Sequence, residues 1–242
     1  MRFRAFDTFR ARAGEQVAPS ITFFDGSGPQ SDDRVTARHE KEIVDWLVRT
    51  PDARELLIQE LGLPADTYVQ TGIVEPLLEP NRRQPPGDID LIFVPDALRA
   101  ISVQVKRFHV VAETRCKDRV PGRQLGNIAK LIEQANGSRK LGFAENYALV
   151  LIECFGPARD EHNFLARGVS PDVIRRIYQI TNDQPIHPDV GVIFLEVTQP
   201  TRSSVDWAGM VSVGIDKRAT QQQQSPGLTA SVRKLIACRP SM

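Results

Sequence analysis

The chain has 242 residues, of which 41% are hydrophobic and 25% charged, and its formal net charge is +1. This is the composition of an ordinary soluble protein, and the overall charge indicates no particular partner. No stretch reaches the roughly 18 consecutive apolar residues of a membrane span, so we expect no membrane partner. The amino terminus, "MRFRAFDTFRARAG", lacks the continuous apolar run of a secretory signal. The widely spaced Cys116, Cys154 and Cys238 favour free thiols in a reducing, cytoplasmic setting.

The first part of the chain alternates between extension, helix and irregular structure. Residues 1–35 are expected to form an N-terminal extension, in which "SITFFDGSG" is a short strand ending in a turn. The stretch "RVTARHEKEIVDWLVRT" predicts a helix whose apolar residues share one face: Ile43, Val44 and Leu47. Thr50 and Pro51 then provide the cap and the first position of a second helix. We expect "LGLPADTYVQTG" to be turn and loop, and "GIVEPLLEP" to be a strand.

A hairpin over residues 87–106 comes next, followed by further helices and strands. The stretch "RFHVVAETRCKDRVPG" indicates a polar connection, and "RQLGNIAKLIEQANGSRKLG" predicts a helix. Near-continuous apolar runs in "YALVLIECF" and "GVIFLEVTQ" predict strands covered on both faces, with the helix "SPDVIRRIYQIT" between them. This order predicts an α/β protein in which antiparallel strands feed a parallel pair. Residues 156–242 would extend that domain, with a glutamine-rich surface linker at 221–227 before a terminal helix.

The hairpin itself, "GDIDLIFVPDALRAISVQVK", carries charged residues among apolar ones. Side chains alternate between the two faces of a strand. One face collects apolar residues: Leu91, Phe93, Ile101, Val103 and Val105. The other collects polar residues: Asp88, Asp90, Gln104 and Lys106. Antiparallel pairing keeps apolar residues opposite apolar ones, so we expect Asp90, Gln104 and Lys106 to form a polar patch on a sheet whose other face is dry, with Asp88 a solvated neighbour.

A carboxylate, an amide carbonyl and an ammonium group at one end of a sheet suit a Mg²⁺ site. This ion prefers oxygen ligands and retains several waters, and a nearby lysine can orient a water or stabilise charge on a phosphate. Glu40 offers a further carboxylate, because it lies three, four and seven residues before the apolar stripe of its helix. A buried acid is costly without a partner. Glu42 lies off that stripe, and we expect it to be solvated.

"GDIDLIFVP…ISVQVK", preceded by a helix with Glu40, resembles the PD-(D/E)XK nuclease superfamily, and looks most like its Holliday-junction-resolvase and Mrr-type branches. The resemblance covers roughly residues 36–155 and implies a restriction-endonuclease-like core of helix, three-stranded meander, helix and strand. It further implies hydrolysis of DNA phosphodiester bonds with Mg²⁺ or Mn²⁺, in defence or DNA processing. It makes Asp90 a metal ligand, Lys106 the catalytic lysine and Glu40 the helix acid.

Gln104 stands at the E/Q ligand position of that resemblance and departs from its acidic form. A glutamine carbonyl can ligate a metal but adds no negative charge. One alternative is therefore a nucleic-acid-binding or assembly module on the same fold, without hydrolysis. Another is an unrelated α/β protein in which Asp90 and Lys106 form a structural salt bridge, with Glu40 far from Asp90.

A basic segment surrounds the hairpin and the following helix. From Arg99 to Lys140 the chain has ten Lys and Arg and three acids, a local balance of +7 that leaves −6 for the rest. Such a segment fits contact with a nucleic-acid backbone; a helix surface that is basic without this role is the alternative. The candidate contacts are Arg107, Lys117, Arg119, Arg123, Gln124 and Lys130. Gln124 either faces the site or lies at the surface at the start of its helix. Residues 156–242 would form a homodimer interface or select the substrate.

Overall fold

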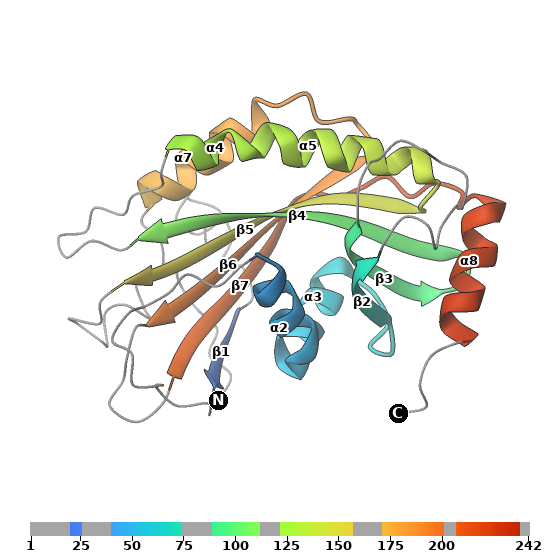
Figure 1. The fold of residues 1–242 in the computed structure, drawn as a ribbon, viewed down its shortest axis with the longest axis horizontal. Helices are drawn as coiled ribbons and strands as arrows, with labels where there is room; N and C mark the ends of the chain where they lie inside the picture. The colour runs from blue at the N-terminus through green and yellow to red at the C-terminus, as the bar shows by residue number, and fades with distance from the viewer. Residues whose placement is uncertain are drawn as a thin grey trace.

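A mixed sheet forms the centre of the chain, as Figure 1 shows. The computed structural model describes residues 20–25, 40–73, 89–111, 122–156, 171–200 and 207–237. Within them the strands are β1 (Ser20–Asp25), β2 (Tyr68–Ile73), β3 (Ile89–Asp96), β4 (Arg99–Val111), β5 (Glu145–Gly156), β6 (Val190–Pro200) and β7 (Trp207–Lys217). Their order across the sheet is β1-β7-β6-β5-β4-β3-β2. Only β4, β5 and β6 pair in parallel, so an α/β fold in which antiparallel strands adjoin parallel ones is confirmed.

Helices cover both faces of the sheet (Figure 1). They are α2 (Glu40–Arg49), α3 (Pro51–Leu61), α4 (Gly122–Leu125), α5 (Asn127–Ser138), α7 (Pro171–Asn182) and α8 (Pro226–Ala237), with a short 3-10 turn η2 (Arg139–Leu141). The pair α2 and α3 packs against one face, and α5 and α7 pack against the other. The parallel strands β5 and β6 are therefore covered on both faces, as their near-continuous apolar runs predict. None of these described helices is long and apolar enough to cross a membrane.

Most predicted elements are present, but several differ from expectation. The single helix predicted over "RQLGNIAKLIEQANGSRKLG" is divided into α4, α5 and η2, and most of the predicted strand "GIVEPLLEP" (residues 74–80) lies outside the described residues. The strand β2 occupies part of the predicted loop "LGLPADTYVQTG", and β4 continues five residues beyond Lys106 into the predicted polar connection. The strand β7 was not predicted at all. Thr50 stands at the cap of α3 as expected, although its side chain makes no capping hydrogen bond. Strands from all three predicted segments lie in one sheet, and the boundaries near residues 35 and 155 stay predictions.

The glutamine-rich segment is part of the folded core at one position. Gln221, Gln222 and Gln223 are exposed as predicted, but Gln224 is buried. Its Oε1 accepts the main-chain N–H of Ala100 at 2.6 Å, and its Nε2 donates to the carbonyl of Ala97 at 2.9 Å. The prediction of a surface linker is therefore wrong for Gln224, because its side chain forms hydrogen bonds with the main chain of the turn between β3 and β4.

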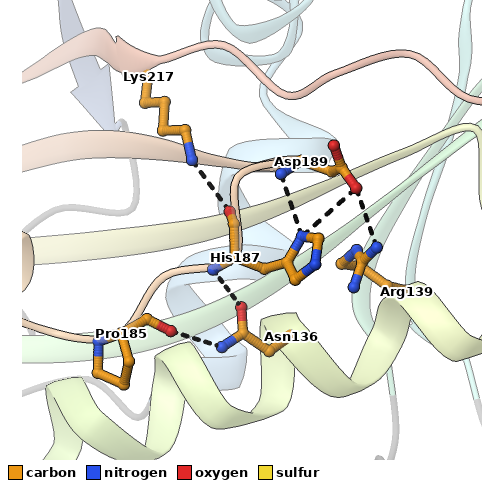
Figure 2. Close-up of polar contacts among 6 residues, drawn as sticks. All are labelled: Asn136, Arg139, Pro185, His187, Asp189 and Lys217. Atoms are coloured by element: carbon orange, nitrogen blue, oxygen red, sulfur yellow. Dashed lines mark hydrogen bonds and ion pairs between the residues drawn. The ribbon is translucent and has the colours of Figure 1, made fainter.

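A polar cluster fixes the end of α5 to the loop before β6, as Figure 2 shows. The amide of Asn136 accepts the main-chain N–H of His187 and donates to the carbonyl of Pro185, both at 3.0 Å. Beside it, Arg139 forms an ion pair with Asp189 at 2.9 Å. These contacts lie at the start of β6 and hold α5 in place over the sheet.

Candidate active site

The two strands of the hairpin separate at Asp90. Leu91 of β3 pairs with Val103 of β4, whereas the carboxylate Oδ2 of Asp90 accepts the main-chain N–H of Val105 at 2.8 Å. The strand β4 continues to Val111 while pairing with β5 on its other side. In the described residues, β4 thus extends past the first residue of β3, Ile89, and side chains contact the edge of β4 beyond this point.

Glu40, the first residue of α2, reaches the same edge from one face of the sheet. Its Oε2 accepts the main-chain N–H of Arg107 at 2.6 Å, and its Oε1 lies 3.2 Å from Nζ of Lys106. The Lys106 ammonium also donates to the carbonyl of Val105 at 3.0 Å. The side chains of Glu40 and Lys106 are 30% and 18% exposed. This ion pair is therefore partly sheltered, yet within reach of a ligand from solvent.

A third side chain continues the series along β4. Gln124, in α4, accepts the main-chain N–H of His109 through Oε1 at 2.8 Å. Alternate residues of a strand direct their N–H groups to the same edge and lie roughly 6.6 Å apart. The acceptors in order are Asp90 at Val105, Glu40 at Arg107 and Gln124 at His109. Among the described residues, these three side chains provide hydrogen-bond acceptors for the N–H groups of this edge, and Gln124 is directed at β4.

Gln104 lies on the face of β4 that α5 covers, and it is fully buried. Its Nε2 donates to Oγ of Ser138 at 3.1 Å. The expected polar patch opposite a dry face is wrong in this respect, because both faces of the sheet are covered. The reason is that Phe108 and Val110, which point to the same face of β4 as Gln104, are apolar and pack under α5.

A buried acid that the sequence analysis did not single out lies on β5, opposite His109 of β4. Glu153 of β5 is 1% exposed, and its Oε2 accepts from Arg107 at 2.6 Å and lies 3.7 Å from Nδ1 of His109. Arg107 is therefore held at both ends, through its main chain by Glu40 and through its guanidinium by Glu153. The available signal was an acid inside the apolar run "YALVLIECF", which requires a partner.

The basic segment is largely offset by acids where the structure describes it. Its ion pairs are Arg99 with Glu145 at 2.7 Å, Lys106 with Glu40, Arg107 with Glu153, and Arg139 with Asp189. Lys130 is exposed on α5. The candidates Asp88, Lys117 and Arg119 lie outside the described residues, as do Cys116 and Cys238, and the side chains of Arg123 and Cys154 are likewise not described. The local balance of +7 thus overstates the charge presented by the described part.

The donor atoms at the hairpin suit a hard cation only in part. Two carboxylates, of Asp90 and Glu40, contact β4 two residues apart, and the third candidate, Gln104, offers an amide. Among the described residues no group of three or more His, Cys, Asp or Glu gathers as a metal site. All three candidates present oxygen donors, which is the chemistry that Mg²⁺ and Mn²⁺ prefer.

Comparisons with known proteins add only weak structural likeness. No protein-family model matches the chain, and no curated protein matches it. Among solved structures it is similar to Pyrococcus furiosus SfsA in complex with Ca²⁺, with 12% identity and a TM-score of 0.24. The similarity covers 71% of this chain and 63% of that one, so the chain spans less than two thirds of its length. A likeness this loose carries no argument about function.

Proposed function

We propose that this protein is a metal-dependent nuclease that hydrolyses phosphodiester bonds of DNA, with a PD-(D/E)XK site made of Glu40, Asp90, Gln104 and Lys106. The observation that carries the proposal is that two carboxylates and an ammonium lie along one short stretch of β4, next to the start of β3. Asp90 and Glu40 contact main-chain groups two residues apart, and Lys106 lies between those groups in the sequence. An arrangement in which Glu40 lies far from the hairpin would have supported a structural salt bridge instead.

The side chains at this edge have the capacity to hold Mg²⁺ or Mn²⁺. A carboxylate offers about four lone-pair positions, so Asp90 and Glu40 can each keep a main-chain N–H and still ligate a cation. Gln104 would add a neutral oxygen. When bound, the cation supplies a Lewis acid beside a phosphodiester.

Lys106 is placed to offset the negative charge that develops on the phosphate during cleavage. Its ammonium is paired with Glu40 and bonded to the carbonyl of Val105, so it is held at the edge of β4 without a substrate. In the proposed reaction it would donate to a phosphate oxygen, where negative charge increases as the bond breaks. Glu40 would keep the ammonium in place.

A DNA backbone would meet this site through cations of the basic segment. We propose that Lys130, together with Lys117, Arg119 and Arg123, contacts phosphates. Arg107 would contact a phosphate while it stays paired with Glu153. Contacts of this kind make the affinity fall as salt rises. A salt titration of DNA binding would measure how many such contacts form.

A nucleic-acid-binding module without hydrolysis is the second candidate. The observation that favours it is the state of Gln104, which adds no charge and donates to Ser138 inside the core. Calorimetric titration with Mn²⁺ separates the two functions, because a module without a metal site gives no saturable heat.

The test of the proposal is incubation of the pure protein with linear, circular and branched DNA, with Mg²⁺, with Mn²⁺ and with a chelator. Asp90→Asn and Lys106→Ala are expected to lower metal-dependent cleavage by about 100-fold or more. Asp96→Asn, at the far end of the same strand, and Lys234→Ala, exposed on α8, are matched controls that should retain it. Cleavage that survives in both folded site variants would refute the assignment.

A further inference from the structure

We infer that Ser138 is a positioning residue for the Gln104 amide, and that it fixes which atom of this amide can face a metal. The inference rests on the proposed function, in which Gln104 is a ligand. Ser138 is the last residue of α5, and Gln104 lies beneath it on β4. Asp90 precedes Leu91, which pairs with Val103, so Asp90 and Gln104 are neighbours across the hairpin.

The direction of the hydrogen bonds at Ser138 determines the orientation of the amide. The Ser138 hydroxyl donates to the main-chain carbonyl of Gln134, 3.0 Å away, and a carbonyl can only accept. With its single proton committed there, Ser138 can only accept from Gln104. The amide must therefore present its Nε2 to Ser138, 3.1 Å away, and its Oε1 is turned away from that hydroxyl.

Burial makes this orientation hard to reverse. Gln104 and Ser138 are both 0% exposed, so water is not available to replace a lost contact. If the amide flipped, its oxygen would face a hydroxyl oxygen whose proton is already used. Ser138 would then have to give up its bond to Gln134.

A fixed orientation matters because the ligand is a glutamine. The two oxygens of a carboxylate are equivalent, and a glutamate at position 104 would present an oxygen whichever way it turned. An amide presents either an oxygen or an NH₂ group, and only the oxygen ligates a cation. We therefore expect the affinity for a cation to depend on Ser138 with glutamine at position 104, and to be largely independent of it with glutamate.

Isothermal calorimetry with Mn²⁺ on four proteins tests this dependence: the wild type, Ser138→Ala, Gln104→Glu and the double variant. Outer residues that orient a ligand typically affect metal affinity by about 10- to 100-fold. We expect Ser138→Ala to weaken Mn²⁺ binding by about that factor in the wild-type background. In the Gln104→Glu background the same change should have little effect. The side-chain NH₂ signals of Gln104 in an NMR spectrum should also shift in Ser138→Ala.

The outcomes separate this inference from the proposed function. If the wild type binds no Mn²⁺, the proposed function fails and the role of Ser138 fails with it. If the wild type binds Mn²⁺ and Ser138→Ala binds it equally well, only the role of Ser138 is refuted. Equal weakening in both backgrounds would mean that Ser138 is merely structural, which also refutes it. Should Ser138→Ala not fold, Ser138→Cys, of nearly the same size but a poor acceptor, carries the same comparison.

Discussion

Glu40 of α2 and Arg107 of β4 are joined by a hydrogen bond of 2.6 Å from the main-chain N–H to the carboxylate. Because the same carboxylate pairs with Lys106, its removal leaves both an N–H and an ammonium without this acceptor. We predict that Glu40→Ala lowers the free energy of unfolding by about 1–2 kcal/mol, measured by urea denaturation. Glu42→Ala is the control in the same turn, since Glu42 is exposed, and should change it by at most about 0.5 kcal/mol. Equal losses in the two variants would contradict the bridging role of Glu40.

Gln224 offers a comparison within one run of glutamines. Its side chain contacts Ala100, Ala97 and Thr229, whereas Gln223 is exposed. We predict that Gln224→Ala destabilises the protein by about 2–3 kcal/mol, because it leaves buried main-chain groups unsatisfied. Gln223→Ala should be close to neutral. Thermal or urea unfolding of the two variants measures the difference, and a neutral Gln224→Ala would contradict the role of this side chain in the turn between β3 and β4.

The faces of the hairpin were predictable from the sequence because strand side chains alternate strictly. Leu91, Phe93, Ile101, Val103 and Val105 all pack into the layer beneath α2 and α3, as the alternation requires. The full length of β4 was not predictable in this way. Arg107 and His109 interrupt its apolar pattern, and the acid that pairs with Arg107, Glu153, belongs to a later strand. Glycines at positions 209 and 214 similarly weaken the pattern of β7.

The approach of Glu40 to the hairpin followed from one general argument, that an acid beside an apolar stripe needs a partner. The same argument applies to Glu153, and it indicates that this buried acid needs a partner. Other contacts have no such signal. The meeting of Gln124 with His109, and of Gln104 with Ser138, depends on how α4 and α5 lie over β4, which local sequence patterns do not determine.

Gly191 of β6 lies directly against the ring of Tyr147, so a larger residue would not fit there. A methyl group at Gly191 would meet the Tyr147 ring and lie 2.7 Å from the main-chain nitrogen of Ala219. We predict that Gly191→Ala destabilises the protein by about 1–3 kcal/mol through overpacking. Combining it with Tyr147→Leu should recover part of that loss, since the ring is one of the two obstacles, and a double-mutant cycle measures the coupling. Strict additivity would count against a direct clash with the ring.

Tyr147 should make the stability of the protein depend on alkaline pH. Burial, reinforced by the carboxylate of Glu145, raises the pKa of Tyr147 from 10.0 to about 12. Below pH 10 the phenol is protonated in both the folded and the unfolded chain, so its contribution is fully present. Between pH 10 and 12 the unfolded chain releases this proton and the folded chain keeps it, so stability should fall by about 2–3 kcal/mol as pH rises. Ultraviolet titration of the folded protein should show one of its three tyrosines ionising late, and Tyr147→Phe should abolish that late step and reduce the alkaline loss of stability. If Tyr147→Phe left the ultraviolet titration above pH 11 unchanged while the protein stayed folded, the buried pairing of Tyr147 with Glu145 would be wrong.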